Sequence, residues 1–210
     1  ENFPAAVAAE DADILAALSA QAPLAVRLYR PLNADAGTLR FKIYNTAKVA
    51  LSDSLPVLEN MGVRVLDEHP YRIGSDNCWI HDLGLQVPPD TELSRIMARF
   101  EDLFMQAWRG QVESDNLNQL VLRTELDARA IVVLRAYTRY FKQLGFAFSQ
   151  TYIEATLNRH ADLAQDIVAL FNARFDPALS GDRDSRQAGI KARIETRLAQ
   201  VASLAEDRIL

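Results

Sequence analysis

The stretch "SLPVLENMGVRVLDEHPYRI", from Ser54 to Ile73, has the pattern of a helix that ends at a glycine and continues directly into a strand. A serine ahead of the apolar run can cap a helix, and Ser52 or Ser54 is placed to do so. Pro56 would then lie in the first turn, where its missing N–H costs least. Gly62 suits the left-handed conformation that ends many helices. The segment therefore predicts a helix joined to a strand by a tight turn.

Alternation with a period of two predicts four strands around this helix. We expect them at Leu24–Arg30, Thr38–Asn45, Val63–Ile73 and Cys78–Val87. In the second strand one face carries Leu39, Phe41 and Ile43, and the other carries Arg40, Lys42 and Tyr44. A turn-rich loop between the first two predicts a hairpin, and "GSDN" between the last two is a strong turn signal. Further helices are expected at 3–20 and 91–110. The order resembles a split βαβ arrangement with its fourth strand missing, and the strand at Leu24–Arg30 would pair in that place. We therefore expect a permuted four-stranded sheet with helices on one face.

After Ser114 the sequence shows helical periodicity alone. Helices are expected at 115–123, 127–144, 149–159 and 162–175, and again from about 185. The breaker-rich "FDPALSGDRDS" precedes the last of them. The fold class is therefore α+β, a ferredoxin-like antiparallel sheet with helices followed by an all-α segment. The predicted domains are an N-terminal helix at 1–22, an α+β module at 23–112 and a helical domain at 113–210.

Composition narrows the class of function. The chain has 210 residues and a net charge of −5, and this acidic balance argues against nucleic acid or an anionic membrane as a partner. The single cysteine, Cys78, excludes an internal disulfide and fits a reducing compartment. No signal peptide or membrane-length apolar segment is evident. We therefore expect a cytoplasmic protein, and the start without methionine suggests a piece of a longer one.

His69, Cys78, His81 and Asp82 form the best candidate metal or acid–base cluster. If Ile73 pairs with Cys78 across the turn, His69 lies opposite Asp82. Alternation then sends His81 and Asp82 to opposite faces of the sheet, which separates them as ligands. We therefore expect a structural contact between His69 and Asp82, and no metal site.

The remaining candidates favour structural roles. The eight glycines are too dispersed for a dinucleotide or phosphate loop. Arg135, Arg139 and Lys142 form a basic stripe at helical spacing, which favours a solvated or docking face over a phosphate or RNA surface. Tyr152 and Glu154, next to an aromatic-rich corner, have the chemistry to line a site, although such corners are usually core.

Three stretches, taken in order, carry a family resemblance. "LSDSLPVLENMGVRVLDEHPYRI" with "WIHDLGL", then "RAYTRYFKQLGFAFSQTYIEATL", then "ALFNARFDP" resemble the bacterial large-type NAD-specific glutamate dehydrogenases. The terminal "VASLAEDRIL" resembles the join into that family's catalytic region. The resemblance implies an internal fragment N-terminal to the catalytic domain of an oxidoreductase that converts L-glutamate and NAD to 2-oxoglutarate, ammonia and NADH. Nothing in this chain matches the family's substrate lysine or dinucleotide-binding glycines. The resemblance therefore implies that this chain holds no catalytic residue and no cofactor, and that NAD binds elsewhere in the parent protein. The fragment alone is expected to be inactive.

The same resemblance implies an ACT-like module, a ferredoxin-like sensor that binds amino acids at sheet edges or interfaces. Such sites use the loop from the first strand into the first helix, where free N–H groups can take a carboxylate. The matching segment is "YNTAKVALSD", so Asn45, Thr46, Ser52 and Asp53 are the candidate effector-binding residues. Asp53 is suited to pair with an amino group. The loop lacks the glycine that such sites often have.

Three interpretations stay open at this point. The chain is a regulatory segment that senses an amino-acid effector, a scaffold that assembles the oligomer without a small ligand, or an independent enzyme. We favour the first and expect no turnover from the chain alone. The expected partners are further copies of the chain in a homo-oligomer and the catalytic domain of the same polypeptide.

Overall fold

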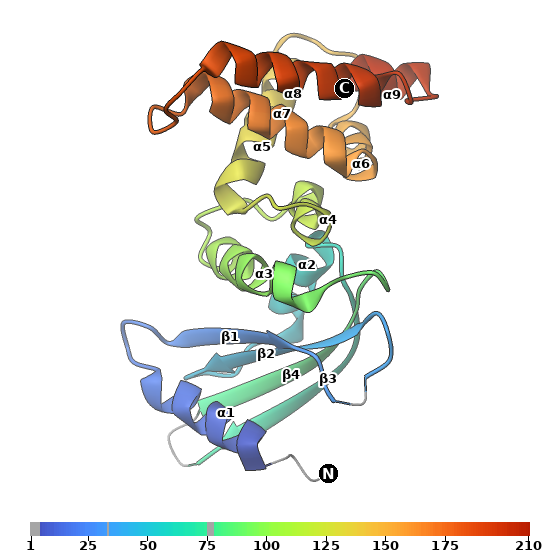
Figure 1. Cartoon of the computed structure of the whole chain (residues 1–210). Helices are drawn as coiled ribbons and strands as arrows, with labels where there is room; N and C mark the ends of the chain where they lie inside the picture. The colour runs from blue at the N-terminus through green and yellow to red at the C-terminus, as the bar shows by residue number, and fades with distance from the viewer. Residues whose placement is uncertain (1–4, 33, 75–77) are drawn as a thin grey trace. The chain divides into compact units, whose positions relative to one another are not determined.

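The computed structural model describes residues 5–32, 34–74 and 78–210, which divide into two compact units, 1–113 and 114–210 (Figure 1). A four-stranded antiparallel sheet with helices is followed by a helical segment, so the predicted α+β fold class is confirmed. The last three residues of the predicted "GSDN" turn, Asn33 in the predicted hairpin loop and the start of the predicted helix at 3–20 lie outside the described residues. The first unit contains α1 (Ala5–Ala17), β1 (Leu24–Tyr29), β2 (Thr38–Asn45), α2 (Leu51–Asn60), β3 (Arg64–Ile73), β4 (Cys78–Gln86) and α3 (Leu93–Trp108).

The sheet has the strand order β1-β2-β4-β3, and every neighbouring pair is antiparallel. β1 pairs with β2 along its whole length, which confirms the predicted hairpin. Ile73 pairs with Cys78 and His69 with Asp82, so the predicted register is confirmed as well. A β-bulge between Val65 and Asp67 interrupts the pairing of β3 with β4.

One face of the sheet is apolar and packs on α2 and α3. The ring of Phe41 lies 5.7 Å from that of Phe100 and 4.8 Å from that of Phe104, in edge-to-face contacts. Leu58 of α2 and Leu83 of β4 are fully buried with them. Residues alternate between faces along a strand, so this core contains the side chains that the period-two pattern assigned to one side.

The opposite face carries α1, which the sequence prediction set apart as an N-terminal helix outside the α+β module and assigned to neither face (Figure 1). Asp11 of α1 accepts a hydrogen bond from Lys42 Nζ at 2.5 Å and another from the Tyr44 hydroxyl at 2.6 Å. Alternation placed these two β2 side chains on the face opposite Phe41, but it could not show that α1 covers that face. Their long apolar stems lie under α1, and only their polar ends need a partner.

The start of α2 also differs from the prediction. The helix begins at Leu51 with Ala50 as its N-cap, and no described side chain caps it. Neither Ser52 nor Ser54 is therefore the cap, and Pro56 lies inside the helix instead of in its first turn. Gly62, with φ of 83°, ends the turn after the helix as predicted.

The second unit is helical throughout residues 114–210, all of which are described. Its helices are the 3₁₀ helix η1 (Asn116–Gln119), α4 (Leu120–Arg123), α5 (Ala128–Gln143), α6 (Gln150–Arg159), α7 (Ala161–Phe175), α8 (Arg183–Leu198) and α9 (Leu204–Ile209). Side chains cap several first turns, as at Asp127, Ser149 and Asp182. The sequence pattern did not predict α9, a helix of 6 residues capped by Ser203.

Candidate functional site

The predicted effector residues lie at the two ends of the β2–α2 loop, residues 46–50. Asn45 is the last residue of β2, with Leu24 and Trp79 as its strand neighbours. Thr46 follows directly, and its N–H donates to the carbonyl oxygen of Pro23 at 3.2 Å. This end of the loop is therefore fixed by the sheet.

The other end of the loop is the exposed first turn of α2. Ser52 and Asp53 both lie there, and the Ser52 hydroxyl donates to Asp53 Oδ1 at 3.3 Å. The Asp53 N–H donates to the carbonyl oxygen of Ala50, which closes the turn. Since no described side chain caps this helix and the Asp53 N–H is used within the turn, the N–H groups of Leu51 and Ser52 are the candidate donors to an anion.

A buried histidine positions this loop, and sequence reasoning missed that role. His81 of β4 is 1% exposed. Its Nε2 accepts a hydrogen bond from the Val49 N–H at 3.1 Å, and its Nδ1 lies 2.6 Å from Glu68 Oε1. A carboxylate can only accept, so Nδ1 carries the proton and Nε2 presents its lone pair to Val49. The neutral imidazole therefore links β3, β4 and the loop that leads into α2.

Aromatic contacts also hold the β2–α2 loop against β4. The Trp79 ring stacks on His81 with centroids 6.0 Å apart, and Lys48 Nζ lies 5.6 Å from the centre of the Trp79 ring. Alternation along β4 put Trp79 and His81 on one face, but only the folded register brings the loop onto them.

The candidate metal cluster is dispersed over the two faces of the sheet. His69 and Asp82 are register partners, but Asp82 accepts hydrogen bonds from Arg40 Nε at 2.8 Å and from the Tyr29 hydroxyl at 3.1 Å. His69 Nε2 lies 3.4 Å from Asp67 instead. In the described part of the chain no group of three or more His, Cys, Asp or Glu side chains is arranged to hold a metal ion.

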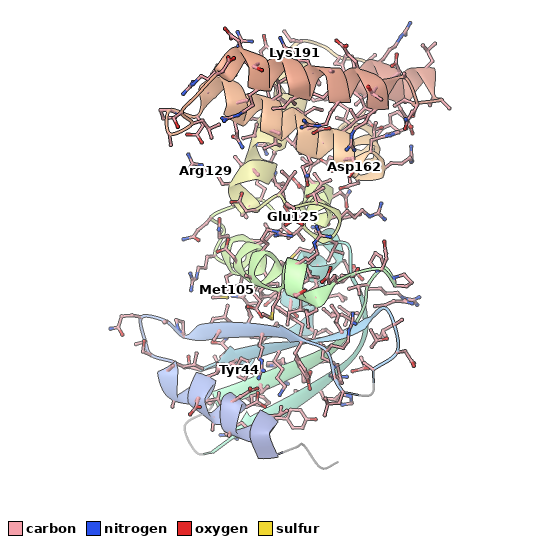
Figure 2. The ribbon with its side chains drawn as sticks, in the orientation of Figure 1. Tyr44, Met105, Glu125, Arg129, Asp162 and Lys191 are labelled. Carbon is pink, nitrogen blue, oxygen red and sulfur yellow. The ribbon has the colours of Figure 1, made fainter. Side chains whose placement is uncertain are left out.

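The α1 face of the sheet is filled by an ion-pair network. Lys42, 1% exposed, pairs with Asp11, and Arg40 pairs with both Asp82 and Asp67. Burial raises the pKa of Tyr44, and its hydrogen bond to Asp11 raises it further. Figure 2 shows Tyr44 on this side of the sheet. The acid–base groups here bind one another and hold α1 to the sheet.

The glycines do not fit a dinucleotide. A pyrophosphate cradle needs closely spaced glycines between a strand and a helix. In the described strands Gly84 is the only glycine, and a Cβ there would meet a carboxylate oxygen of Asp67 at 2.6 Å. This glycine therefore makes room for Asp67 beside Arg40.

Two predictions in the helical unit need correction or detail. Arg135 is buried and bonds to Asp115 at 2.6 Å and to Asn118 at 2.9 Å, so it leaves the predicted basic face to Arg139 and Lys142. The prediction that Arg135 belongs to the basic face was wrong. Helical periodicity cannot show that Asp115, the N-cap of η1, contacts α5. Glu154 is buried, accepts a hydrogen bond from Gln150 at 2.9 Å, and has a pKa raised by burial.

Comparison with known proteins identifies the family. Residues 23–97 match the family described as glutamate dehydrogenase, ACT3 domain, and residues 112–177 match glutamate dehydrogenase, helical motif 3. Over 100% of its length the chain is 37% identical to the NAD-specific glutamate dehydrogenase of Halomonas elongata and 38% identical to that of Pseudomonas aeruginosa. The chain belongs to the family of NAD-specific glutamate dehydrogenases. A third NAD-specific glutamate dehydrogenase, from Mycobacterium tuberculosis, is 37% identical over 77% of the chain.

The match is to a small part of each relative. The chain spans 13% of the Halomonas glutamate dehydrogenase, 14% of the Pseudomonas protein and 11% of the mycobacterial one. The first unit contains the region that matches the ACT3 domain, and the predicted ACT-like sheet is confirmed. Among the described residues no helix has the length and apolar character needed to cross a membrane.

Proposed function

We propose that this chain is a non-catalytic regulatory and assembly segment of an NAD-dependent glutamate dehydrogenase. The full protein would oxidise L-glutamate to 2-oxoglutarate and ammonia and reduce NAD in its catalytic domain, in the cytoplasm. The names of the relatives support the activity of the full protein. The chain covers only 11% to 14% of their lengths, which supports a segment outside the catalytic domain. Asp11–Lys42 and Glu68–His81 support the non-catalytic role, because both pairs are engaged in holding structural elements together.

The structure of the β2–α2 loop is the main support for the proposed regulatory role. His81 fixes the loop at Val49, and α2 then begins without a side-chain cap from the described residues. An amino-acid carboxylate would accept hydrogen bonds from the first N–H groups of α2, with the helix dipole in its favour. Its ammonium group would pair with Asp53, which is exposed in the same turn. The loop is thus suited to an effector that carries both charges.

The two edges of the sheet support the assembly role. At the β1 edge, the Leu28 N–H donates to Glu101 Oε1 of α3 at 2.6 Å, so a helix side chain occupies that edge. At the other edge, β3 pairs only with β4 in the described chain, and Leu66 and Ile73 are 51% and 40% exposed. An open strand edge presents backbone groups that another chain can pair with. We propose that β3 meets a second copy of the chain in a homo-oligomer.

Thermal unfolding of the chain with each amino acid tests the sensor. A ligand that binds only the folded state adds about 2.7 kcal/mol of stability at a hundredfold excess over its Kd. We expect a selective rise in Tm with one amino acid, lost in Asp53→Asn and kept in Glu59→Gln, the same charge change at the exposed far end of α2. A rise that survives Asp53→Asn would place the ligand elsewhere and contradict this site.

The alternative is a scaffold that assembles the enzyme without a small ligand. The exposed Ser52–Asp53 contact favours it, because these two candidate residues already bond to each other. A flat thermal response to all amino acids, together with loss of the native oligomer when Leu24–Val87 is deleted from the full protein, would support the scaffold. The third class, an independent enzyme, predicts NADH formation from glutamate by the chain alone, and we expect none.

A further inference from the structure

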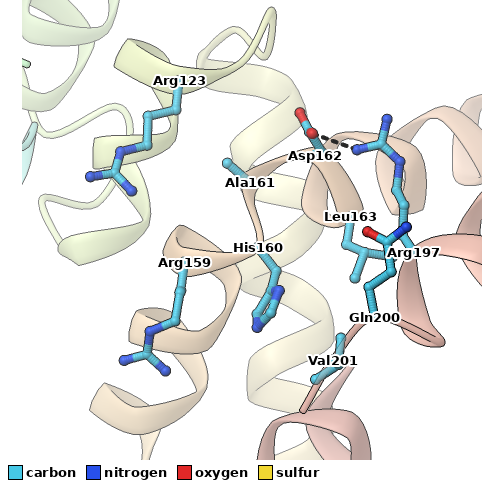
Figure 3. A pocket seen from close by; sticks show the side chains of 9 residues that line it. All are labelled: Arg123, Arg159, His160, Ala161, Asp162, Leu163, Arg197, Gln200 and Val201. Atoms are coloured by element: carbon cyan, nitrogen blue, oxygen red, sulfur yellow. Dashed lines mark ion pairs between the residues drawn. The ribbon is translucent and has the colours of Figure 1, made fainter. Parts of the chain in front are cut away.

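A cavity of about 390 Å³ opens in the helical unit, and three arginines are among the residues that line it (Figure 3). Its polar lining comes from the end of α4, the α6–α7 junction and the end of α8. We call it the arginine pocket, defined by Arg123, Arg159, His160, Asp162, Arg197 and Gln200. All of these residues belong to the unit at 114–210. The volume lies within the range of small-molecule sites.

Two of the three arginines already have carboxylate partners. Arg197 pairs with Asp162 at 2.7 Å and lies 3.1 Å from Asp166, and Figure 3 shows the first of these pairs at the side of the pocket. Arg159 pairs with Glu206 of α9. These pairs fix the walls of the pocket and cancel much of their own charge.

Arg123 is different. Its guanidinium donates one hydrogen bond, to the backbone carbonyl oxygen of Asn158 at 3.3 Å. Within residues 5–32, 34–74 and 78–210 no carboxylate lies at ion-pair distance from it. A guanidinium has five N–H donors in a planar fork, so most of the donors of Arg123 remain available. It is therefore the unneutralised cation of the pocket.

The other polar groups in the pocket are the paired arginines, the Asp162 carboxylate that Arg197 neutralises, His160 and Gln200. His160 Nε2 lies 2.9 Å from Glu206 Oε2, and since a carboxylate only accepts, the proton is on Nε2. His160 adds no free donor, because its N–H is directed to Glu206. Burial, and then the charge of Arg159, lowers the pKa of His160, so the ring is neutral at pH 7. α7 begins at Ala161 without a cap from any described side chain, which leaves first-turn N–H groups beside the pocket. Gln200 adds an amide.

We propose that the arginine pocket binds a small organic anion through its phosphate or carboxylate group, with Arg123 as the principal contact. Both oxyanions match the planar fork of a guanidinium, and both are favoured at the N-terminus of a helix. The site is separate from the β2–α2 loop, so it would be a second ligand site in the same chain. Neither its existence nor its failure depends on the amino-acid site proposed above.

Isothermal titration of the chain with inorganic pyrophosphate and, separately, with malonate tests the proposal. Hydrogen bonds to a charged group contribute about 1.5–3 kcal/mol, so Arg123→Gln should weaken binding by about tenfold or more. Arg129→Gln is the matched control, because Arg129 is an exposed arginine at the first turn of α5 and does not line the pocket (Figure 2). It should retain the wild-type affinity. Circular dichroism of each variant verifies that the helices are intact.

The two probes distinguish the ligand classes. Binding of pyrophosphate alone assigns a phosphate ligand, and binding of malonate alone assigns a carboxylate. Arg123→Lys is the second variant, to be used if Arg123→Gln does not fold. It keeps the positive charge but loses the planar fork of donors, so it should bind with intermediate affinity. The proposal is overturned if neither probe binds the wild-type chain, or if Arg123→Gln and Arg129→Gln weaken binding equally.

Discussion

The two faces of the sheet are stabilised in different ways. Beneath α2 and α3 the contacts are aromatic and aliphatic, with Phe41 against Phe100 and Phe104. Beneath α1 the contacts are charged, with Lys42 and Tyr44 both bonded to Asp11. Burial of apolar area on the first face gains free energy without regard to direction. The second face gains only where donor and acceptor are aligned, because each charge has lost its water.

This difference shows how one short strand serves two purposes. β2 supplies Phe41 to the core and Lys42, the next residue, to α1. The apolar face fixes the fold of the first unit, whereas the charged face determines whether α1 stays in place. Mutations on the two faces should therefore have effects of different size and kind.

Phe41→Ala should have the largest effect. It leaves a cavity between the sheet and α3, and truncations of buried phenylalanine cost about 3–5 kcal/mol. Urea unfolding followed by tryptophan fluorescence measures this loss, since both tryptophans, Trp79 and Trp108, lie in the first unit. Phe41→Leu should cost clearly less. Equal losses in both variants would mean that packing at this position does not determine the stability of the face.

Asp11→Asn should have an intermediate effect, because it removes the anion that neutralises buried Lys42. Breaking a buried pair costs about 3–5 kcal/mol when the remaining charge stays buried. Here α1 can move away and let water reach Lys42, which limits the loss to about 1–3 kcal/mol. Hydrogen exchange should show the loss of protection mainly in α1.

Asp13→Asn provides the control for that change. Asp13 lies on the same helix and is exposed, so its replacement should shift stability by less than about 0.5 kcal/mol. If the two variants behave alike, the Lys42–Asp11 pair does not hold α1 on the sheet, and the comparison between the faces fails.

Glu101→Gln makes the same carboxylate-to-amide change on the α3 side and should have the smallest effect, with the opposite sign. Burial raises the pKa of Glu101 above its ordinary value of 4.5, while the Leu28 N–H opposes the shift. The ionised side chain therefore destabilises the fold at pH 7, and the amide, which keeps the acceptor oxygen, should be more stable by less than about 1 kcal/mol.

The pH dependence of stability tests whether the ionised Glu101 side chain destabilises the fold. The folded state holds the Glu101 proton more tightly than the unfolded chain, so wild-type stability rises as pH falls through the raised pKa towards 4.5. The advantage of the amide should therefore be present at pH 7 and shrink in acid. Thermal unfolding of both proteins from pH 7 to pH 4.5 measures it, and a growing advantage in acid would contradict the assignment.

Most of the fold could be predicted from the sequence, because alternation and helical periodicity are local properties. Leu39, Phe41 and Ile43 were placed on one face correctly, and the pairing of Ile73 with Cys78 followed from the position of the turn. The sequence was less informative where a contact with a residue far away in the chain determines the local structure. The start of α2 was predicted wrongly, because the loop before it is fixed by the Val49–His81 hydrogen bond. Alternation gave the face of Lys42 but could not show its pairing with Asp11.

The candidate sites were less accessible to sequence reasoning. Asn45, Thr46, Ser52 and Asp53 were chosen by resemblance, and their role in effector binding stays a prediction. His81 was considered only as a member of a metal or acid–base cluster, because nothing local shows that its ring faces the N–H of Val49. The arginine pocket has no sequence signature, since its residues come from helix ends that only the fold brings together.

The irregularities of β3 bear on how far an assembly can grow. The bulge beside Leu66 breaks the regular spacing of the strand, and Pro70 has no N–H to donate. Long, flat, regular edges template open-ended fibres, whereas bulges and proline restrict such pairing. A partner strand could therefore pair with β3 only over short stretches. Growth at this edge should end with a closed pair of copies, which would keep the proposed assembly from polymerising through this sheet.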